Sequence, residues 1–208
     1  HILLFIALNL LNKHQLISIE ISSKKILYKN NIIKNELAWW FNKMKIDLFD
    51  TNYLWLLDIK LPETSDLLGF VYQSLSLEGN KSQGGSYYTP KNIVDEIVNE
   101  YVEQTSVVLD PCCGSGQFLL SVADRVNNPR NIWGFDIDEI ASRLARLNLL
   151  VRFPGQEFSP NIYHKNTLLE VQSNNLFKND IPHFDFIFTN PPWGVHFSKL
   201  ESAELKSI

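Results

Sequence analysis

The sequence predicts an α/β protein in which a parallel sheet follows a mainly helical N-terminal segment. Two observations lead to this prediction. Short apolar runs typical of buried strands alternate with segments that carry apolar residues at helical spacing. Polar residues follow these runs, which is typical of the carboxyl edge of an open parallel sheet, where ligands bind. Such alternation predicts right-handed crossovers. The sequence stops soon after the last run, so we expect a sheet that is incomplete at its C-terminal side.

Length and composition describe an ordinary globular protein. The chain has 208 residues, 45% of them hydrophobic, which is enough for one good core and a small second one. Its net charge of -4 excludes a chain that is basic throughout, so contact with nucleic acid would need a local patch or sequence outside this chain. The apolar opening, Ile2 to Leu11, is too short for a membrane span and lacks the features of a signal peptide. We expect a helix cut from a larger domain, and no membrane association.

The only two cysteines, Cys112 and Cys113, are adjacent. Neighbouring cysteines rarely satisfy disulfide geometry, and no His or Cys lies near enough in sequence to complete a zinc pattern. We therefore expect small reduced side chains, no metal, and a cytoplasmic protein.

Residues 1–77 form a predicted accessory segment, which carries no chemical motif from His1 to about Lys60. Leu16 to Glu20 and Lys25 to Tyr28 predict a hairpin, Ile32 to Met44 predicts an amphipathic helix, and Asp66 to Leu75 predicts another helix.

Five aromatic residues in this segment raise the alternative of a base-stacking platform. They are Trp39, Trp40, Phe41, Tyr53 and Trp55. Their spacing is more typical of side chains that pack on a core or a neighbouring domain, and we favour that interpretation.

A polar, glycine-bearing stretch, Glu78 to Ser86, places the boundary between the accessory segment and the main domain, residues 78–208. Thr89 then predicts a helix N-cap, and Pro90 suits the first helical position. The helix continues with an apolar stripe: Ile93, Val94, Ile97, Val98, Tyr101 and Val102. By themselves these signals predict a helix start and no function.

The first predicted strand of the main domain, Val107 to Asp110, leads through a turn of small residues into a predicted helix, Gln117 to Val126. Gly114 and Gly116 let the backbone come close to a ligand, and Asp110 can meet a cation or an amine. The turn lacks the Gly-Lys-Ser/Thr of a phosphate-binding P-loop. It also lacks the third small residue of a dinucleotide fingerprint.

The second predicted strand, Asn131 to Phe135, ends in Asp136-Ile137-Asp138. Asp136 is placed to bind ribose hydroxyls through charge-assisted hydrogen bonds. Asp138 predicts the cap of a helix from Glu139 to about Arg152. A third strand follows at Asn161 to His164, with Asn166 just beyond it.

The fourth predicted strand, Phe184 to Thr189, runs into Asn190-Pro191-Pro192-Trp193. Asn190 offers a carbonyl acceptor, the two prolines stiffen the backbone, and Trp193 offers a flat stacking face. Such a site could accept hydrogen bonds from an exocyclic amine while holding its ring. Taken alone, the tetrad is equally compatible with a plain loop after a strand.

Taken in order, Tyr88-Thr89-Pro90, Asp110 to Gly116, Asp136 and Asn190 to Trp193 resemble the motifs of the amino-methylating DNA methyltransferases. The resemblance is to the N6-adenine enzymes of the gamma arrangement, as in type I modification subunits and fused type II restriction–modification proteins. It covers roughly Asp66 to Gly194. It implies the class I methyltransferase fold, which is Rossmann-like, and S-adenosylmethionine as the cofactor. It also implies adenine N6 in DNA as the target, with a specificity or restriction subunit as a possible partner.

The resemblance also implies roles for the cofactor-binding residues. Thr89 and Pro90 would lie against the methionine part of the cofactor, and Tyr88 would also be a cofactor-binding residue. Asp110 and Pro111, with the turn from Gly114 to Gly116, would hold its amino-acid end. Asp136 would bind the ribose, with Ile137 beside the adenine ring. Asn166 stands where the family more often has Asp facing the adenine amine, so an acceptor is kept and a charge is lost.

For catalysis, the resemblance implies that Asn190 and the Pro191 carbonyl accept hydrogen bonds from the target amine. Pro192 would stiffen the motif and Trp193 would stack on a flipped base. The family's further strands and its recognition domain are not in this sequence. We therefore expect these residues alone to methylate poorly and without site specificity.

Three alternatives stay open. Glutamine-modifying protein methyltransferases share the Asn-Pro-Pro-aromatic motif, but Thr89-Pro90 and the proline after Asp110 favour DNA. An RNA methyltransferase is a lesser option. A non-catalytic cofactor-binding or assembly fragment would use its aromatic-rich first sixty residues.

Overall fold

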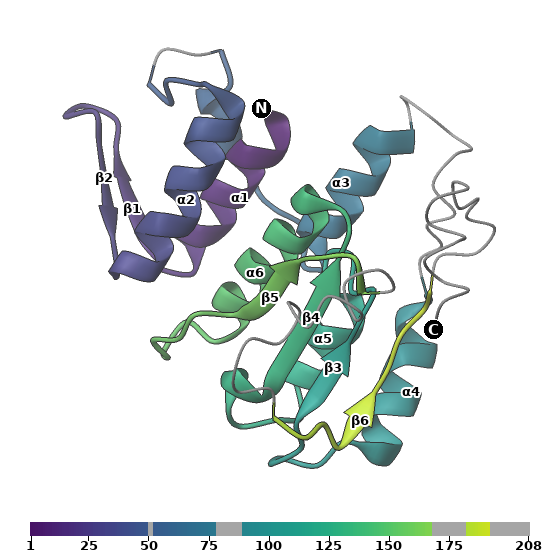
Figure 1. The fold of residues 1–208 in the computed structure, drawn as a ribbon. Coiled ribbons are helices and arrows are strands. Elements are labelled where there is room, and N and C mark those ends of the chain that lie inside the picture. Colours follow the sequence, from purple (N-terminus) through teal and green to yellow (C-terminus); the bar gives the residue numbers. More distant parts are fainter. Residues whose placement is uncertain (50–51, 78–88, 168–181, 192–208) are drawn as a thin grey trace.

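The computed structural model describes residues 1–49, 52–77, 89–167 and 182–191 (Figure 1). Two N-terminal helices and a hairpin lie on one side of the molecule, and a parallel sheet with its helices lies on the other. The predicted α/β fold with a helical N-terminal part is confirmed. The predicted boundary at residue 78 lies outside the described residues and stays a prediction.

Helix α1 (Ile2–Lys13) is buried on almost every side, from Leu3 to Asn9. A helix that is apolar almost all round belongs in a core. The buried amide of Asn9 donates to the carbonyls of Leu56 (2.8 Å) and Ile59 (3.0 Å). Those carbonyls lie in and just after the short helix η1 (Leu54–Leu57), so the amide ties the two segments together.

Strands β1 (Ile17–Glu20) and β2 (Lys25–Tyr28) form the expected antiparallel hairpin, with Ile17 opposite Tyr28. Helix α2 (Asn31–Met44) follows, and the Asn30 side chain caps it by accepting from the backbone N–H of Ile33 at 3.0 Å. The hairpin and the helix are confirmed within one residue at each end.

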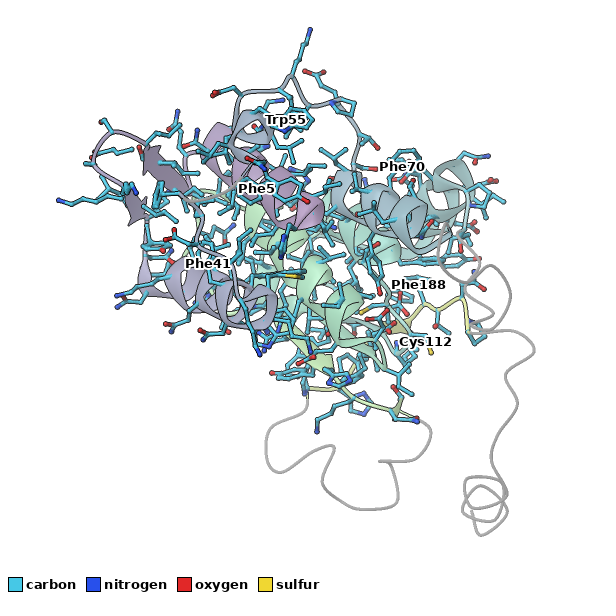
Figure 2. The ribbon with its side chains drawn as sticks, turned by 90° about the horizontal axis from the view of Figure 1, so that it is seen from above. Phe5, Phe41, Trp55, Phe70, Cys112 and Phe188 are labelled. Atoms are coloured by element: carbon cyan, nitrogen blue, oxygen red, sulfur yellow. The ribbon has the colours of Figure 1, made fainter. Side chains whose placement is uncertain are left out.

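The five aromatic residues of this segment do not share one environment. Trp40 is fully buried, and Trp39, Phe41 and Tyr53 are packed against the core. Trp55 is 63% exposed, so it does not pack on the core, and packing on a neighbouring domain stays a prediction at that position (Figure 2). The reason is local: in the tight turns of η1, Leu56 and Leu57 take the buried positions and leave Trp55 outside.

Four strands of the described residues form one parallel sheet in the order β5-β4-β3-β6. They are β3 (Val108–Asp110), β4 (Ile132–Asp136), β5 (Asn161–His164) and β6 (Phe186–Ile187). Strand β6 is shorter than predicted. Backbone bonds from Asp185 to Val107 (2.8 Å) and from Phe188 to Leu109 (3.0 Å) continue its pairing at both ends.

Helices α5 (Gln117–Ala123) and α6 (Glu139–Arg152) pack on one face of the sheet (Figure 1). A Cβ at Gly134 would lie 2.8 Å from side-chain atoms of both Leu119 and Ile162. The small residue therefore allows the close approach of α5 to β4. The other face carries the buried Leu109 and Phe135, with Trp133 and Phe184 packed on them.

Helix α4 (Lys91–Tyr101) packs against α5, and the turn η2 (Pro129–Asn131) precedes β4. Helix α3 (Leu67–Leu77) contacts both α1 and α6, so it joins the two parts of the molecule. Within the described ranges, no helix has the length and apolar character needed to cross a bilayer.

Candidate active site

The carboxyl ends of three neighbouring strands bring together the polar residues that the sequence singles out. Asp110 ends β3, Asp136 ends β4, and Asn190 follows β6. Because β3 lies between β4 and β6, its carboxyl end is flanked by the other two. The edge of the sheet is therefore a site built from separate stretches of the chain.

Asp110 is the most deeply buried of these groups, at 2% exposed. It accepts a hydrogen bond from the backbone N–H of Cys112 at 3.1 Å and another from the Thr189 side chain. Burial raises the pKa of this carboxyl to about 7 despite these bonds. Among the described residues, no lysine or arginine forms an ion pair with Asp110 or Asp136. Within the part of the chain that the structure describes, the negative charge of Asp110 is thus poorly compensated, which fits a cationic ligand group.

The turn after β3 is bent into a form that glycine favours. Gly114 and Gly116 both have positive φ, at 53° and 100°. The Gly114 N–H donates to Asp136 Oδ2 at 2.7 Å, and the Cys113 N–H donates to the Phe135 carbonyl at 2.9 Å. The turn is therefore fastened to the end of β4, and both of its cysteines are free thiols.

Asp136 faces this turn from the neighbouring strand. Its Oδ1 accepts from the Asp138 N–H at 2.8 Å, and its Oδ2 accepts from Gly114. Each carboxylate oxygen has a second lone pair, so further hydroxyl donors can be accommodated. Burial also raises the pKa of this carboxyl. The next side chain, Ile137, is 66% exposed and offers an apolar face beside the carboxylate.

Asp138 caps α6, as predicted. Its Oδ1 accepts from the N–H groups of Ile140 (2.8 Å) and Ala141 (3.1 Å). The two acidic residues therefore have different roles. Asp138 caps helix α6, and Asp136 accepts a hydrogen bond from the turn after β3.

Thr89 does not cap α4, and this corrects the sequence prediction. Pro90 holds the N-cap position, no side chain caps the helix, and the first helical residue is Lys91. The Thr89 hydroxyl instead accepts a hydrogen bond from Asn190 Nδ2 at 3.1 Å. This long-range contact with the end of β6 takes the place of a local cap.

The segment after β5 also returns to this edge. The Thr167 hydroxyl donates to the Pro111 carbonyl at 2.8 Å, which keeps the neighbouring Asn166 near the turn after β3. His164 Nε2 lies 2.9 Å from the Ile137 carbonyl. Tyr88, Pro192 and Trp193 lie outside the described residues.

Sequence reasoning did not single out Thr189, His164 or Thr167. Thr189 directly precedes Asn190 at a strand end, and that position was the available signal. The other two are visible only once the chain is folded. The described residues contain no cluster of three or more His, Cys, Asp or Glu side chains that could hold a metal ion.

Comparisons with known proteins identify the family and support the fold. The family model described as N-6 DNA Methylase matches residues 63–207. Type II methyltransferase M.VspI of Vibrio sp. (strain 343) is 32% identical over 148 residues, which is 66% of this chain and 32% of that protein. Type I restriction enzyme MjaIX methylase subunit of Methanocaldococcus jannaschii is 29% identical over 142 residues, which is 62% of this chain and 23% of that protein. The chain thus spans about a third or less of these relatives.

Among solved structures, a modification subunit of a putative type I restriction enzyme from Vibrio vulnificus YJ016 has a similar fold. The TM-score is 0.52 at 22% identity, over 74% of this chain and 34% of that one. A type I restriction-modification methyltransferase subunit from Streptococcus thermophilus also reaches a TM-score of 0.52, at 19% identity, covering 81% of this chain and 39% of that one. These likenesses support the fold.

Proposed function

The chain belongs to the N-6 DNA methylase family, and on that premise we propose that it carries the cofactor-binding and catalytic part of an adenine-N6 DNA methyltransferase. The observation that supports this most is the position of Asn190. It lies one residue after Thr189, whose side chain bonds to the buried, poorly compensated Asp110. The residue that carries the amide therefore follows a strand whose neighbour ends in a carboxylate that fits a cation.

The proposed cofactor is S-adenosylmethionine, which supplies an activated methyl group on a sulfonium and carries an ammonium group at its amino-acid end. Asp110 would hold that ammonium, since a carboxylate with few donors gains most from a cationic partner. Asp136 would accept from the ribose hydroxyls, and the exposed Ile137 would cover the adenine ring. Thr89, Pro90, Pro111 and Asn166 would complete the pocket, together with Tyr88.

Asn190 and the Pro191 carbonyl would act on the target amine. The N6 lone pair of adenine is delocalised into the ring, so the amine is a poor nucleophile. Two acceptors placed around the nitrogen favour a more tetrahedral form and aim its lone pair at the methyl group. Positioning and electrostatics would carry the catalysis, without a covalent enzyme intermediate. Pro192 would stiffen the motif, and Trp193 would stack on the base.

The biological setting is part of the proposal. The relatives are named as a type II methyltransferase and as the methylase subunit of a type I restriction enzyme. We infer a role in a cytoplasmic restriction–modification system, in which DNA sequence is read by a domain or subunit outside this chain. A specificity or restriction subunit is the expected partner.

The test is methyl transfer from a radiolabelled donor to DNA, RNA and protein, using the protein expressed from its complete reading frame. Label on adenine N6 of DNA is the expected result, and label only on RNA or on protein glutamine would overturn the proposal. Absence of cofactor binding by calorimetry would favour an assembly role.

Asn190→Ala then tests the proposed catalytic role. We expect kcat to fall on the order of 10²–10³-fold, as when one oriented polar group is removed at a transition state. The affinity for S-adenosylhomocysteine should change little. Asn92→Ala is the matched control because Asn92 is exposed on α4. Retained kcat in Asn190→Ala would contradict the assignment.

A further inference from the structure

The first turn of α3 is buried against the glycine turn that follows β3. Asp66, just before the helix, is 1% exposed and accepts three hydrogen bonds. Its Oδ1 accepts from the Gly69 N–H and from Asn148 Nδ2, both at 2.8 Å. Its Oδ2 accepts from Ser115 Oγ at 2.6 Å. Asp66 thus caps its own helix and also holds the middle residue of Gly114-Ser115-Gly116.

The approach between α3 and this turn is very close. A Cβ at Gly69 would lie 2.1 Å from Ser115 Oγ and 2.2 Å from Asp66 Oδ2, so a side chain there would force the two segments apart. Asn148 Nδ2 also donates to the Ser115 carbonyl at 2.9 Å. Ser115 is therefore held at both its hydroxyl and its carbonyl, by residues from two different helices.

The same helix reaches the loop after β4. The Tyr72 hydroxyl donates to Asp138 Oδ2. The Asp138 N–H in turn donates to Asp136 Oδ1 at 2.8 Å. Helix α3 therefore contacts both of the loops that carry the proposed cofactor ligands, although it supplies none of those ligands itself.

These loops depend on outside support for their shape. Glycine loses more conformational freedom on folding than any other residue, so a turn with two glycines at positive φ is costly to order. A loop that is already ordered before the ligand arrives binds more tightly, because that cost does not oppose binding.

We propose that Asp66 and Tyr72 are positioning residues through which α3 holds both cofactor loops in their binding form, so that the accessory segment controls cofactor affinity. The identity of the cofactor rests on the proposed function. The contacts of α3 with the two loops do not.

The experiment uses the protein expressed from its complete reading frame and titrates it with S-adenosylhomocysteine. Tyr72→Phe removes only a hydroxyl, and Asp66→Ala removes all three acceptor contacts. We expect Kd to rise about 3- to 10-fold in Tyr72→Phe and more than about 10-fold in Asp66→Ala, since hydrogen bonds to charged groups are the stronger ones. KM for the cofactor should rise while kcat at saturating cofactor is kept.

Two controls separate positioning from general destabilisation. Asp66→Asn keeps an acceptor for Gly69 and Asn148 and can donate to Ser115, so it should restore most of the affinity. Tyr101→Phe, at an exposed tyrosine of α4, should leave Kd unchanged. An unchanged Kd in Tyr72→Phe and Asp66→Ala, with only a lowered melting temperature, would overturn the proposal.

Amide hydrogen exchange measured without ligand tests whether α3 holds the two loops, even when the wild type binds no cofactor. Faster exchange at Gly114 and Gly116 in both variants is expected, and unchanged exchange would overturn the proposal. If the wild type binds no cofactor but both variants still show this faster exchange, only the proposed function is refuted.

Discussion

The contact between α2 and α6 and the carboxyl edge of the sheet both bury carboxylates, but only the first neutralises its charge. Glu36 of α2 is 5% exposed and is met by Arg143 and Arg146 of α6. Asp110 is equally buried and is met by a backbone N–H and a hydroxyl. In a contact that only stabilises the fold, residues of the protein can neutralise the buried charge. At the proposed binding edge, a buried carboxylate without a cationic partner among the described residues is consistent with a site for a cationic ligand.

Each charged group of the Glu36 contact has several partners within the protein. Arg143 Nη1 lies 3.1 Å from Glu36 Oε2, and its guanidinium lies 4.7 Å from the centre of the Trp39 ring. Arg146 Nε donates to Glu36 Oε1 at 2.7 Å, and its Nη1 donates to the carbonyls of Pro160 (2.8 Å) and Ile162 (2.9 Å). Every member has partners, as a buried ionic group requires.

Removing Glu36 should have the largest effect on stability. In Glu36→Ala, two arginines are left without their carboxylate, and we expect the free energy of unfolding to fall on the order of 3–5 kcal/mol. Glu36→Gln, which keeps an acceptor, should lose less. The measurement is denaturant unfolding alongside a cofactor titration. A change in cofactor Kd larger than about threefold would show that the two regions are not independent.

The pH dependence of stability should come from the carboxyl edge of the sheet, where Asp110 is buried. Burial raises the pKa of Asp110 from 3.8 to about 7, and it also raises the pKa values of Asp66 and Asp136. A raised pKa in the folded state means that folding favours the protonated form. The stability that the protonated Asp110 contributes is therefore fully present below about pH 4 and is lost as pH rises through its folded pKa of about 7. For Asp110 the loss reaches about 4 kcal/mol.

Unfolding curves between pH 4 and pH 8 measure this effect, and Asp110→Asn should flatten the slope. Cofactor affinity should run the other way and increase with pH through 7, because a cation binds the ionised carboxylate. Equal slopes in wild type and Asp110→Asn would contradict the uncompensated state of Asp110.

The smallest effect is expected at an exposed ion pair of the α2–α6 contact. Lys43 lies 2.8 Å from Glu139, with side-chain exposures of 49% and 35%. Water screens this pair, so Lys43→Ala should cost less than about 1 kcal/mol. A loss comparable to that of Glu36→Ala would show that burial does not distinguish the two pairs.

Local patterns predicted most of the elements. Strand β5 and helix α6 begin and end where the sequence places them, because apolar spacing and the Asp138 cap are local signals. The cap at Thr89 was wrong for a related reason. A threonine before a proline gives the same local signal whether its hydroxyl caps a helix or meets Asn190 from a segment 101 residues away. Trp55 shows the same limit, since its exposure depends on which residues of η1 face the core.

The sequence by itself determined the parallel sheet, the order of its motifs, and which polar residues end its strands, because these follow from apolar periodicity and from turn and cap chemistry. The tertiary structure decided which buried charges are compensated. Glu36 meets its arginines, and Asp66 its serine and asparagine, across 49 to 110 positions of sequence. Apolar periodicity is a local signal and does not indicate which residues this far apart in sequence come into contact. Only the packing of the elements determines these contacts.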